Sequence, residues 1–436
     1  MAKQKIILFH PRTCHDKNYR NFWIPYSVLS VGSQLSNNGY DVEILDNNFK
    51  QKGHDEIVCS LTRPDMVGIS AIIGHQISEG LDFATKIKEK FPEVPILFGG
   101  TAPTILPEQF FESDCVDVVV RGQGEQTSTE VVEALKDKRG LENIPGISFK
   151  DKNGKVVHNS ARMPVNRDSF AAYDYSLVNP RDYLRTDNEI SGKVLNYISS
   201  QGCPFGCGFC SEVALYDRKW IPNSLERIMH EFGELVEQHG ANGIKLHDAN
   251  FFANKKRVLS FAKEMQKRGW NIPWAGSAHP KNILVLDDNE LKLVRESGCS
   301  RILIGAESGN DEELKYIKKG ITTAHVVEVA QRLGKIGISG GFTVIVGYPG
   351  FPEENISRTL EFGKKLISIS SLHEVKAHVY APYPGTPLYQ EAIKHGFVAP
   401  KTIEDWANYD YYEVQTPWLK QDVTNRISAF NKEYHK

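Results

Sequence analysis

The feature that most constrains the fold is an alternation of short β-branched runs with amphipathic helical patterns, which occurs in two series. In the first series the apolar runs are residues 5–9, 41–45, 66–73, 96–98 and 116–120. Between them, residues 76–91 and 125–138 carry apolar side chains at the three- and four-residue spacing of a helix. Short buried strands that alternate with helices predict a parallel sheet with helices on both faces. We therefore predict an α/β fold whose N-terminal domain, residues 1–145, is Rossmann-like.

A second alternating series follows. Strands are expected at residues 194–199, 243–248, 272–277, 301–307, 339–346 and 375–380, with helices such as 225–239, 255–268 and 353–369 between them. Six strand–helix units predict a partial (β/α)6 TIM-type barrel at residues 191–386, with its chemistry at the C-terminal ends of the strands. Residues 146–190 are expected to form a hairpin that turns at Asn153-Gly154, followed by a linker. Residues 387–436 are expected to form a short C-terminal segment.

Size and charge agree with a soluble globular protein of two domains. The chain has 436 residues, whereas single cores rarely grow past about 250–300 residues. Its formal net charge of −2 favours neither nucleic acid nor an anionic membrane surface. We see no apolar run near the roughly 20 residues of a membrane span and no secretory signal pattern. We expect a cytoplasmic protein with no nucleic-acid partner and no membrane span.

Three of the seven cysteines, Cys203, Cys207 and Cys210, lie directly after the first expected strand of the second domain, in CPFGCGFC. A structural zinc site normally has four protein ligands, and no second CxxC or HxxxH completes one here. A [4Fe–4S] cluster held by only three cysteines keeps one iron open to another ligand. We prefer the cluster to its two alternatives, a zinc site and three buried cysteines without metal.

The spacing CxxxCxxC with an aromatic residue before the last cysteine resembles the signature of radical S-adenosylmethionine (SAM) enzymes. The resemblance implies that the open iron binds SAM and that cluster reduction cleaves SAM to a 5′-deoxyadenosyl radical. It also implies site residues, with SAM contacts at Phe209, Asp248, Asn250, Glu307, Ser308, Gly347 and Pro349 and catalytic side chains at Tyr348 and Tyr383. From the residues alone, Glu307 beside Ser308 could equally be a charge at a helix N-terminus. The segments 347–350 and 382–386 could equally be simple turns.

The N-terminal domain has no G-x-G-x-x-G after its first strand, which disfavours a dinucleotide. Its glycines follow the later strands instead, at Gly68, Gly74, Gly99, Gly100, Gly122 and Gly124. Ligands of open α/β sheets bind outside the carboxyl ends of the strands, and glycines there let a bulky ligand approach the backbone.

The pattern DMVGISAIIGHQ…ILFGGTAPTILPEQ…VDVVVRGQGEQT is similar to the cobalamin-binding domain of cobalamin-dependent radical SAM enzymes. With the barrel, this resemblance covers about residues 1–390. It implies cobalamin contacts at Ser70, Gly74, His75, Gln76, Gly99, Gly100, Thr101, Pro103, Thr104, Gly122, Gln123, Gly124 and Glu125. Two residues depart from the family pattern, which often has His at Ala102 and Glu at Gln123.

The axial ligand of the cobalt is a separate question. The motif D-x-H-x-x-G is absent, which implies that cobalamin binds without the lower axial histidine of many other cobalamin proteins. His10 and His75 lie near strand ends, where an isolated histidine is more often a satisfied polar residue than a ligand.

The resemblance leaves three functions. The leading one is a methyltransferase, in which a methyl group passes from SAM through methylcobalamin to an unactivated carbon while a second SAM supplies the radical. The alternatives are a cobalamin-dependent radical SAM enzyme that does not methylate, as in oxidative cyclisation, and a cobalamin-binding sensor with an idle barrel. We expect a small-molecule or protein side-chain substrate and an electron donor such as ferredoxin or flavodoxin. The aromatic C-terminal residues either cap the cavity or pack on the barrel; they are Trp406, Tyr409, Tyr411, Tyr412 and Trp418.

Overall fold

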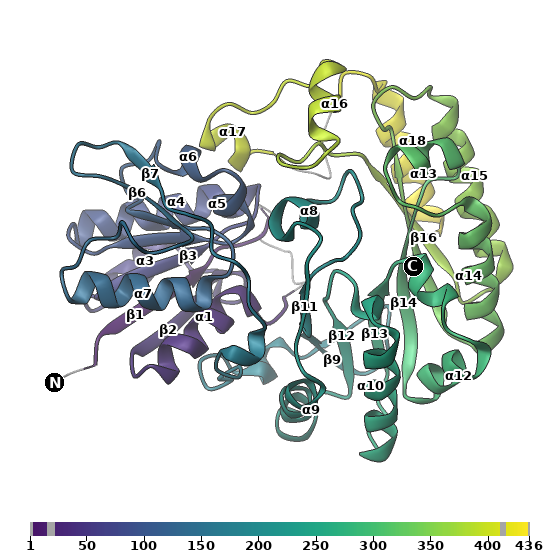
Figure 1. The fold of residues 1–436 in the computed structure, drawn as a ribbon, viewed down its shortest axis with the longest axis horizontal. Coiled ribbons are helices and arrows are strands. Elements are labelled where there is room, and N and C mark those ends of the chain that lie inside the picture. The colour runs from purple at the N-terminus through teal and green to yellow at the C-terminus, as the bar shows by residue number, and fades with distance from the viewer. Residues whose placement is uncertain (1–2, 15–21, 410–415, 435–436) are drawn as a thin grey trace. The chain divides into compact units, whose positions relative to one another are not determined.

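The computed structural model describes residues 3–14, 22–409 and 416–434. The chain folds into two compact units, drawn in Figure 1. Unit 1 comprises Met1–Tyr183 and Ala399–Tyr411, and unit 2 comprises Leu184–Val398 and Tyr412–Lys436.

Unit 1 is built on a seven-stranded sheet in the order β2-β1-β3-β4-β5-β6-β7. The strands are β1 (Lys5–His10), β2 (Asp41–Asp46), β3 (Met66–Ser70), β4 (Ile96–Gly99), β5 (Val118–Val120), β6 (Ile147–Lys150) and β7 (Val156–His158). The first five are parallel, and their order 2-1-3-4-5 is doubly wound, with its topological switch point between β1 and β3. The predicted Rossmann-like domain is confirmed, with strand ends shifted by a few residues.

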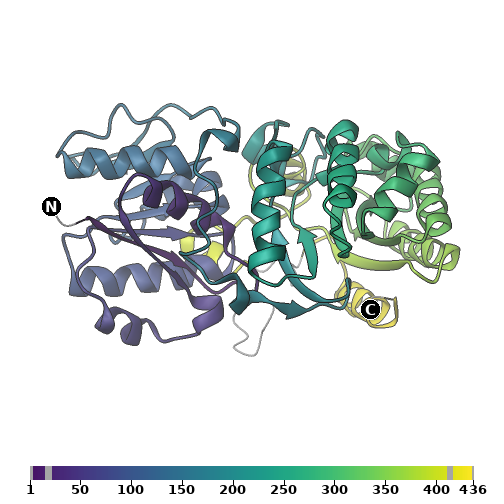
Figure 2. The same ribbon diagram turned by 90° about the horizontal axis from the view of Figure 1, so that it is seen from below.

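Helices lie on both faces of this sheet (Figures 1 and 2). They are α1 (Tyr26–Asn37), α2 (Asn47–Lys50), α3 (His54–Ser60), α4 (His75–Lys90), α5 (Thr101–Ile105), α6 (Pro107–Phe110) and α7 (Gly124–Lys136), with short 3-10 turns η1 (Arg167–Ser169) and η2 (Pro180–Tyr183). Helix α1 packs beside α7, and α3 packs beside α4. Because helices cover both faces, Ile6, Ile7 and Phe9 of β1 are all fully buried, which explains the continuous apolar run.

Residues 146–190 differ from the expected hairpin and linker. The hairpin is present, but β6 pairs antiparallel with β5 and extends the sheet. The chain then stays with unit 1 as far as Tyr183, because Tyr173 packs on Tyr26 of α1 (ring centroids 4.6 Å apart) and Arg167 donates to Ser30. This segment is buried through polar and aromatic groups, so it has no apolar period that the sequence analysis could detect.

Unit 2 is a curved sheet in the order β16-β15-β14-β13-β12-β9-β8. Its strands are β8 (Arg185–Thr186), β9 (Lys193–Tyr197), β12 (Gly243–Leu246), β13 (Trp274–Ala278), β14 (Cys299–Glu307), β15 (Ser339–Val346) and β16 (Glu374–Val379). All but β8 run parallel, so the predicted partial barrel of six parallel strands is confirmed. Between β9 and β12 along the chain, β10 (Ser200–Gly202) and β11 (Trp220–Pro222) form a separate antiparallel ribbon.

The helices of unit 2 follow their strands as expected. They are α8 (Ser211–Tyr216), α9 (Leu225–Gly233), α10 (Lys255–Lys267), α11 (Pro280–Leu284), α12 (Asp288–Glu296), α13 (Asp311–Tyr316), α14 (Thr323–Ile336), α15 (Glu354–Ile369), α16 (Tyr389–Lys394) and α18 (Gln421–Tyr434). Helix α9 continues as a π-helical turn, η3 (Glu234–Gln238), and a 3-10 turn, η4 (Phe251–Ala253), precedes α10. Along β14, Ile302, Ile304 and Ala306 are fully buried, whereas Leu303 is 38% exposed. Alternate residues of a strand face opposite sides, so the other face of β14 is left for a cavity.

The C-terminal residues 387–436 do not form one segment. Residues 399–411 return to unit 1, where α17 (Ile403–Ala407) packs against α4. The N–H of Ile403 donates to the Glu112 carboxylate at 2.9 Å. In unit 2, α18 packs against β16. Tyr411 and Tyr412 lie outside the described residues.

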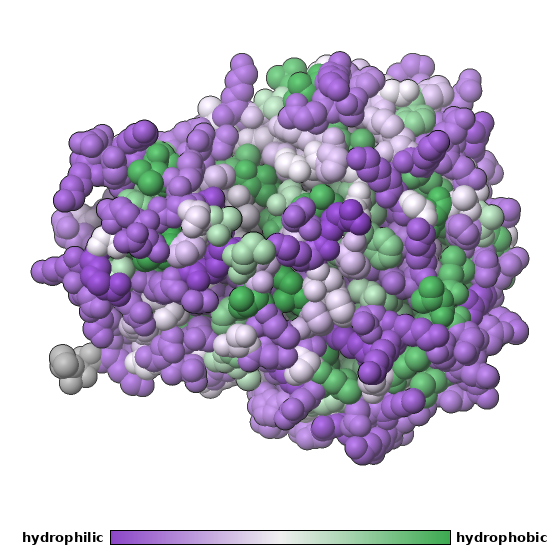
Figure 3. Space-filling view, viewed as in Figure 1, coloured by the Kyte–Doolittle hydropathy of each residue, from purple (hydrophilic) through white to green (hydrophobic). Residues whose placement is uncertain are grey.

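The described residues include no helix that is both long and apolar enough for a membrane span. The face drawn in Figure 3 is mainly hydrophilic, and its apolar residues are scattered.

Candidate functional site

The three cysteines lie on one loop of unit 2, residues 203–210, which we call the cysteine loop. Its Gly208 N–H donates to the Ile317 carbonyl (2.7 Å), and its Gly208 carbonyl accepts from the N–H of Leu388 (2.9 Å). A Cβ at Gly208 would approach Leu388 to 3.1 Å. Two other segments therefore hold the loop tightly, and glycine is favoured at its centre.

The three thiols of the cysteine loop are free and act on one another electrostatically. Burial raises the pKa of Cys203, Cys207 and Cys210, to about 12 for Cys210, and neighbouring thiols add to the rise at Cys207 and Cys210. A bound metal centre supplies the positive charge that keeps such thiols deprotonated. Among the described residues, no three His, Cys, Asp or Glu side chains lie close enough together to hold a single metal ion. A cubane cluster needs no such group, because each cysteine binds a different iron, so the loop fits a [4Fe–4S] cluster.

A buried ion pair lies beside the thiols. Glu307, the last residue of β14, accepts a hydrogen bond from the Lys319 ammonium at 2.8 Å, and both side chains are buried. Glu307 has a φ of 63°, a region that non-glycine residues rarely adopt. A Cβ at Gly305 would lie 2.2 Å from the Glu307 carboxylate and 2.6 Å from the ammonium, so this glycine makes room for the pair. Burial lowers the pKa of Lys319, but Glu307 and Cys207 outweigh it and raise the value overall.

The sequence analysis missed Lys319, because Lys318-Lys319-Gly320 is typical of an exposed basic turn. In the structure Lys318 and Gly320 have φ values of 55° and 70°, and this left-handed turn follows α13. The Lys319 carbonyl lies 3.0 Å from His279 Nε2, and the His279 ring stacks on Phe205 of the cysteine loop with centroids 3.7 Å apart. His279 was missed as well.

Asp248 and Asn250 lie near the cysteine loop but differ in their partners. Asp248 accepts from the N–H and hydroxyl of Ser199 (2.8 and 2.6 Å) and from Ser200. It thus supports the connection that leads to the cysteines, and its contact with SAM stays a prediction. Asn250 donates to Cys203 Sγ at 3.8 Å, while its buried Oδ1 has no hydrogen-bond partner among the described residues. That oxygen is available to a donor group of a bound molecule.

Ser308 is fully committed within unit 2. Its hydroxyl donates to Glu313 and accepts from the N–H of Asn310 at 3.0 Å. Ser308 therefore caps the turn before α13, and a contact with SAM stays a prediction.

Tyr348 and Tyr380 are buried at the carboxyl ends of β15 and β16. Their rings are 5.5 Å apart, and Tyr348 is 6.2 Å from Phe209 of the cysteine loop. Neither hydroxyl has a hydrogen-bond partner among the described residues. Burial raises the pKa of both, well above the ordinary value for Tyr348, so both hydroxyls stay protonated. Tyr348 was a predicted site residue, whereas Tyr380 was missed.

The other predicted residues of this rim lie in turns. The Gly347 carbonyl accepts from the Trp418 indole N–H at 2.9 Å, Gly347 has a φ of 80°, and Pro349 is buried. The Tyr383 carbonyl accepts from the Thr386 hydroxyl at 2.7 Å, and the Tyr383 side chain is half-buried. Both stretches form the turns that the residues alone suggested, and their contacts with ligands stay predictions.

A cavity of about 390 Å³ opens on the inner face of the unit 2 sheet. It is lined by Glu189, Lys245, Leu246, His247, Asp248, Ala275, Gly276, Ser277, Arg301 and Leu303. The cations along it are paired: Arg301 lies 2.6 Å from Glu189 and also contacts Glu374, and Lys245 lies 2.6 Å from Glu189. The cavity wall is thus polar with its charges compensated. The lining extends from the first residues of β13 and β14, at Ala275 and Arg301, to Asp248 after β12. Of these side chains, Asp248 was a predicted site residue.

In unit 1 the predicted glycines gather where β4 and β5 end. Gly100 has a φ of 101°, and its Cβ would lie 2.7 Å from the Ala71 carbonyl, so glycine is required. The Thr104 hydroxyl donates to the Gly100 carbonyl (2.7 Å) and accepts from the Gly122 N–H (3.0 Å). A Cβ at Gly99 meets nothing closer than 3.8 Å. We call Gly99, Gly100, Thr104 and Gly122 the glycine edge; Thr101 and Pro103 follow it in α5, and Ser70 ends the adjacent β3.

Other predicted cobalamin contacts are engaged within unit 1. Gln76 donates to the Pro11 carbonyl, Gln123 bonds the backbone of Val165 in both directions, and Glu125 accepts from Ser30 and lies 3.5 Å from Arg167. Gly74 donates to the Trp406 carbonyl at 3.2 Å, and a Cβ at Gly124 would meet Val31 at 3.1 Å. These residues hold neighbouring segments in place, and a role toward cobalamin stays a prediction.

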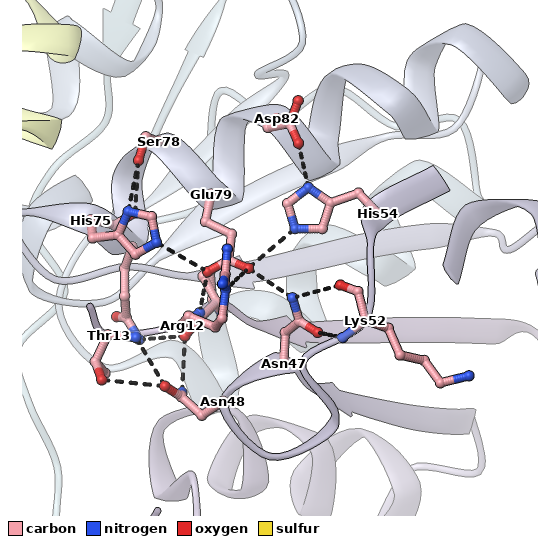
Figure 4. A network of polar contacts seen from close by, with 12 residues as sticks. Arg12, Thr13, Asn47, Asn48, Lys52, His54, His75, Ser78, Glu79 and Asp82 are labelled. Carbon is pink, nitrogen blue, oxygen red and sulfur yellow. Dashed lines mark hydrogen bonds and ion pairs between the residues drawn. The ribbon is translucent and has the colours of Figure 1, made fainter. Parts of the chain in front are cut away.

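A polar network lies at the switch point between β1 and β3 (Figure 4). The buried Glu79 carboxylate accepts from the N–H and guanidinium of Arg12, from Asn47 at 2.7 Å and from His54 at 3.3 Å. Burial alone would raise the pKa of Glu79, but the bonds from His54, Arg12 and Asn47 lower it to about 2. The network holds residues 11–13 after β1. No local pattern in the sequence predicts it.

The two histidines considered as cobalt ligands lie next to this network. His75 Nε2 is 3.7 Å from the Glu79 carboxylate. His10 is half-buried, desolvation lowers its pKa, and its Nδ1 has no hydrogen-bond partner among the residues described. His10 ends β1, and His75 begins α4 shortly after the end of β3.

Two family models match the chain. The model of the radical SAM superfamily matches residues 197–363, and the model of the B12 binding domain matches residues 16–132. The first covers the cysteine loop and most of unit 2, and the second covers the glycine edge.

Relatives and solved structures are similar to this chain over both matched regions. An uncharacterized methyltransferase of Pyrococcus horikoshii is 30% identical over 85% of this chain and 78% of its own. The anaerobic magnesium-protoporphyrin IX monomethyl ester cyclase of Rubrivivax gelatinosus is 26% identical over 93% of this chain and 71% of its own. The radical SAM methyltransferase TsrM of Kitasatospora setae, solved with cobalamin and a [4Fe-4S] cluster, has a similar fold with a TM-score of 0.72 at 18% identity, covering 90% of this chain and 75% of TsrM. The chain therefore belongs to the cobalamin-dependent radical SAM enzymes, whose cofactors are a [4Fe–4S] cluster, SAM and cobalamin.

Proposed function

We propose that this enzyme is a methyltransferase that moves a methyl group from SAM, by way of cobalamin, to an unactivated carbon of a small molecule or a protein side chain. The observation that carries the proposal is the cysteine loop, because its three thiols lie near buried polar groups that have no partner in the described part of the chain, and the same chain has the glycine edge. The similarity to the Pyrococcus and Kitasatospora proteins, both described as methyltransferases, supports methyl transfer over other outcomes.

We assign the cofactor contacts as follows. Cys203, Cys207 and Cys210 hold the cluster, while Asn250 Oδ1 and Glu307 accept from donor groups of SAM. The glycine edge receives cobalamin, because its backbone is open to a bulky ligand where a Cβ at Gly99 would have room. When bound, the cluster and SAM supply a radical that removes hydrogen from carbon, and cobalamin carries the methyl group.

The substrate occupies the cavity on the inner face of the unit 2 sheet. The cations of its wall, Lys245 and Arg301, are paired with Glu189. Such a wall suits a neutral polar molecule or a neutral side chain. Tyr348 and Tyr380 present protonated hydroxyls that can donate hydrogen bonds to SAM or substrate, and their buried rings exclude water from the radical. A reduced ferredoxin or flavodoxin supplies the electron.

The second candidate function is radical chemistry with cobalamin but without methylation. The similarity to the Rubrivivax cyclase, which extends over 93% of this chain, favours it. Both candidates use the same cofactors, so the fate of the SAM methyl group separates them.

The test follows that methyl group and needs no substrate. Anaerobic protein with cluster and cobalamin is reduced and given SAM deuterated at the methyl group, and the extracted cobalamin is analysed by mass spectrometry. Methyl transfer predicts label in the cobalamin and an equal amount of S-adenosylhomocysteine. Production of 5′-deoxyadenosine with unlabelled cobalamin and no S-adenosylhomocysteine would favour the second candidate. Protein stripped of cobalamin is the control, since it should release no S-adenosylhomocysteine.

A further inference from the structure

Lys319 and Glu307 form a buried ion pair whose burial is energetically costly. Lys319 is 6% exposed and Glu307 is 5% exposed, with 2.8 Å between the ammonium and the carboxylate. Removing both charges from water costs several kcal/mol per ion, and such pairs are often no more stabilising than apolar residues of the same size. Glu307 also sits in a left-handed backbone conformation. Strain and buried charge at one place are typical of a functional site.

The backbone directs Lys319 inward. It lies in the turn between α13 and α14, where the Ile317 carbonyl receives the N–H of Gly208 from the cysteine loop. Its own carbonyl lies 3.0 Å from Nε2 of His279, which stacks on Phe205 of the same loop. One short turn therefore supports the cysteine loop on two sides and carries the cation between these supports.

The Lys319 charge acts on every thiol of the cysteine loop. The Lys319 ammonium is buried against the Glu307 carboxylate, in the turn that hydrogen-bonds the cysteine loop, and it is close enough to Cys203, Cys207 and Cys210 to interact with them electrostatically. Glu307 acts on Cys207 in the opposite direction. The two members of the pair therefore have opposite electrostatic effects at the same sulfur.

A charge near the cluster affects how easily the cluster is reduced. A cubane bound by three thiolates gains negative charge when it takes up an electron, and in a site removed from water a nearby cation stabilises the reduced form. Net charge and hydrogen bonding are the main protein controls on such potentials. SAM cleavage requires the reduced cluster, so the potential decides whether a cellular donor can start the reaction.

We propose that Lys319 is a charge-compensating residue that raises the reduction potential of the cluster and that Glu307 holds it in place while limiting its effect. The inference rests on the proposed cluster site at Cys203, Cys207 and Cys210. One electron passes from a reduced ferredoxin or flavodoxin to the cluster, the donor is oxidised by one electron, and Lys319 stays an ammonium throughout. No bond or proton changes at the pair.

The test is a redox titration of the full-length, reconstituted protein without SAM, read by the EPR signal of the reduced cluster. Lys319→Met should lower the equilibrium constant for one-electron reduction about tenfold, a shift of about 59 mV toward negative potential. Glu307→Gln should shift the potential in the positive direction, and Lys319→Arg should stay near wild type. Lys281→Met is the matched control, because Lys281 is exposed and close to Gly320 but is not among the groups that act on the thiols.

Lys319→Met leaves Glu307 buried and unpaired, which can prevent folding. The double variant Lys319→Met/Glu307→Gln removes both charges, and its potential should be more negative than that of Glu307→Gln alone. Equal potentials in those two proteins, each with a full complement of iron, would overturn the inference. Wild-type protein that assembles no iron–sulfur cluster would instead refute the proposed cluster site. A purely structural role for the pair predicts loss of cluster content without shifts of opposite sign.

Discussion

The carboxyl edges of the two parallel sheets are built from different groups. In unit 1 the edge is made of backbone, at Gly99, Gly100 and Gly122, and its shape is set by positive φ angles at the latter two. In unit 2 the edge is made of side chains, namely the three thiols, a buried ion pair and two tyrosine hydroxyls. A glycine edge offers room to a large molecule, whereas thiols and charges bind and polarise a small inorganic centre.

Glu79 of unit 1 and the polar groups around the cysteine loop also differ in how they are satisfied, although His10 Nδ1 beside the Glu79 network has no partner among the described residues either. The Glu79 carboxylate in unit 1 accepts hydrogen bonds from Arg12, Asn47 and His54, so protein groups compensate its charge. In unit 2, Asn250 Oδ1 and the hydroxyls of Tyr348 and Tyr380 have no partner among the described residues. Buried polar groups are normally hydrogen-bonded, so the exceptions indicate where a ligand completes the site. Polar groups whose hydrogen bonds are all made within the protein hold the fold, whereas buried groups without partners are available to a ligand.

The largest effect that separates the two edges should come from the cysteine loop. Replacing Cys203, Cys207 or Cys210 by Ala should abolish iron binding and SAM cleavage, because three thiolates are needed to hold a cubane of about four irons. Cobalamin retention should stay unchanged, since the glycine edge belongs to unit 1. Iron analysis and the corrin absorbance of the same preparation measure both. Cys59→Ala, an exposed cysteine of unit 1, is the control; normal iron content in all three loop variants would contradict the assignment.

The next effect concerns the Glu79 network of unit 1. The Glu79 pKa of about 2 lies below the ordinary value of 4.5, so the charge stabilises the fold on the order of 3 kcal/mol at neutral pH. Because the folded value is the lower one, this contribution is present above pH 4.5 and is lost as the pH falls toward 2. Glu79→Gln should therefore unfold at lower temperature than wild type at pH 7, with a smaller difference at pH 3.

Thermal unfolding followed by circular dichroism at the two pH values tests this prediction. The control is Glu56→Gln, which removes an exposed carboxylate that pairs with Lys52 and should cost well under 1 kcal/mol. Equal destabilisation by Glu79→Gln at both pH values would show that the network stabilises the fold through shape rather than charge.

A comparable loss, in affinity rather than stability, is expected beside the cysteine loop. Glu307→Gln should weaken SAM binding roughly ten- to hundredfold, since a hydrogen bond to a charged group contributes about 1.5–3 kcal/mol. Anaerobic equilibrium dialysis with labelled SAM measures the change in protein of matched iron content. Glu296→Ala, on the exposed face of α12, should bind SAM normally. Unchanged affinity in Glu307→Gln would confine this residue to holding Lys319.

The smallest effect should come from filling the glycine edge. Gly99→Trp should weaken cobalamin retention roughly five- to hundredfold, because overfilling a packed site costs about 1–3 kcal/mol. Position 99 is preferable to Gly100, where any Cβ would collide with the Ala71 carbonyl and disturb the fold itself. Gly53→Trp, at an open position of the same unit, is the control. The retained cofactor of wild type should show a base-off absorbance spectrum, because the D-x-H-x-x-G motif is absent. A spectrum with the benzimidazole still bound to cobalt would contradict this prediction.

Much of the architecture could be predicted from the sequence. Continuous apolar runs such as residues 5–9 predicted strands buried on both faces, and the spacing of Cys203, Cys207 and Cys210 predicted the cofactor. The expected linker after residue 158 and the single C-terminal segment were not found as predicted. Arg167, Tyr173 and Ile403 hold those stretches on unit 1 by polar and aromatic contacts, which leave no periodic trace.

The sequence by itself determined the two alternating α/β series, the cysteine loop and the glycines that end the strands of unit 1. Each of these is a local property, because periodicity and spacing report which side chains a short segment buries or brings together. Only the tertiary structure decided that Lys319 pairs with Glu307 beside the thiols and that Glu79 gathers Arg12 and His54. Their partners are brought together by the convergence of strand ends and loops, and a buried charge is stable only where that convergence supplies its counter-charge.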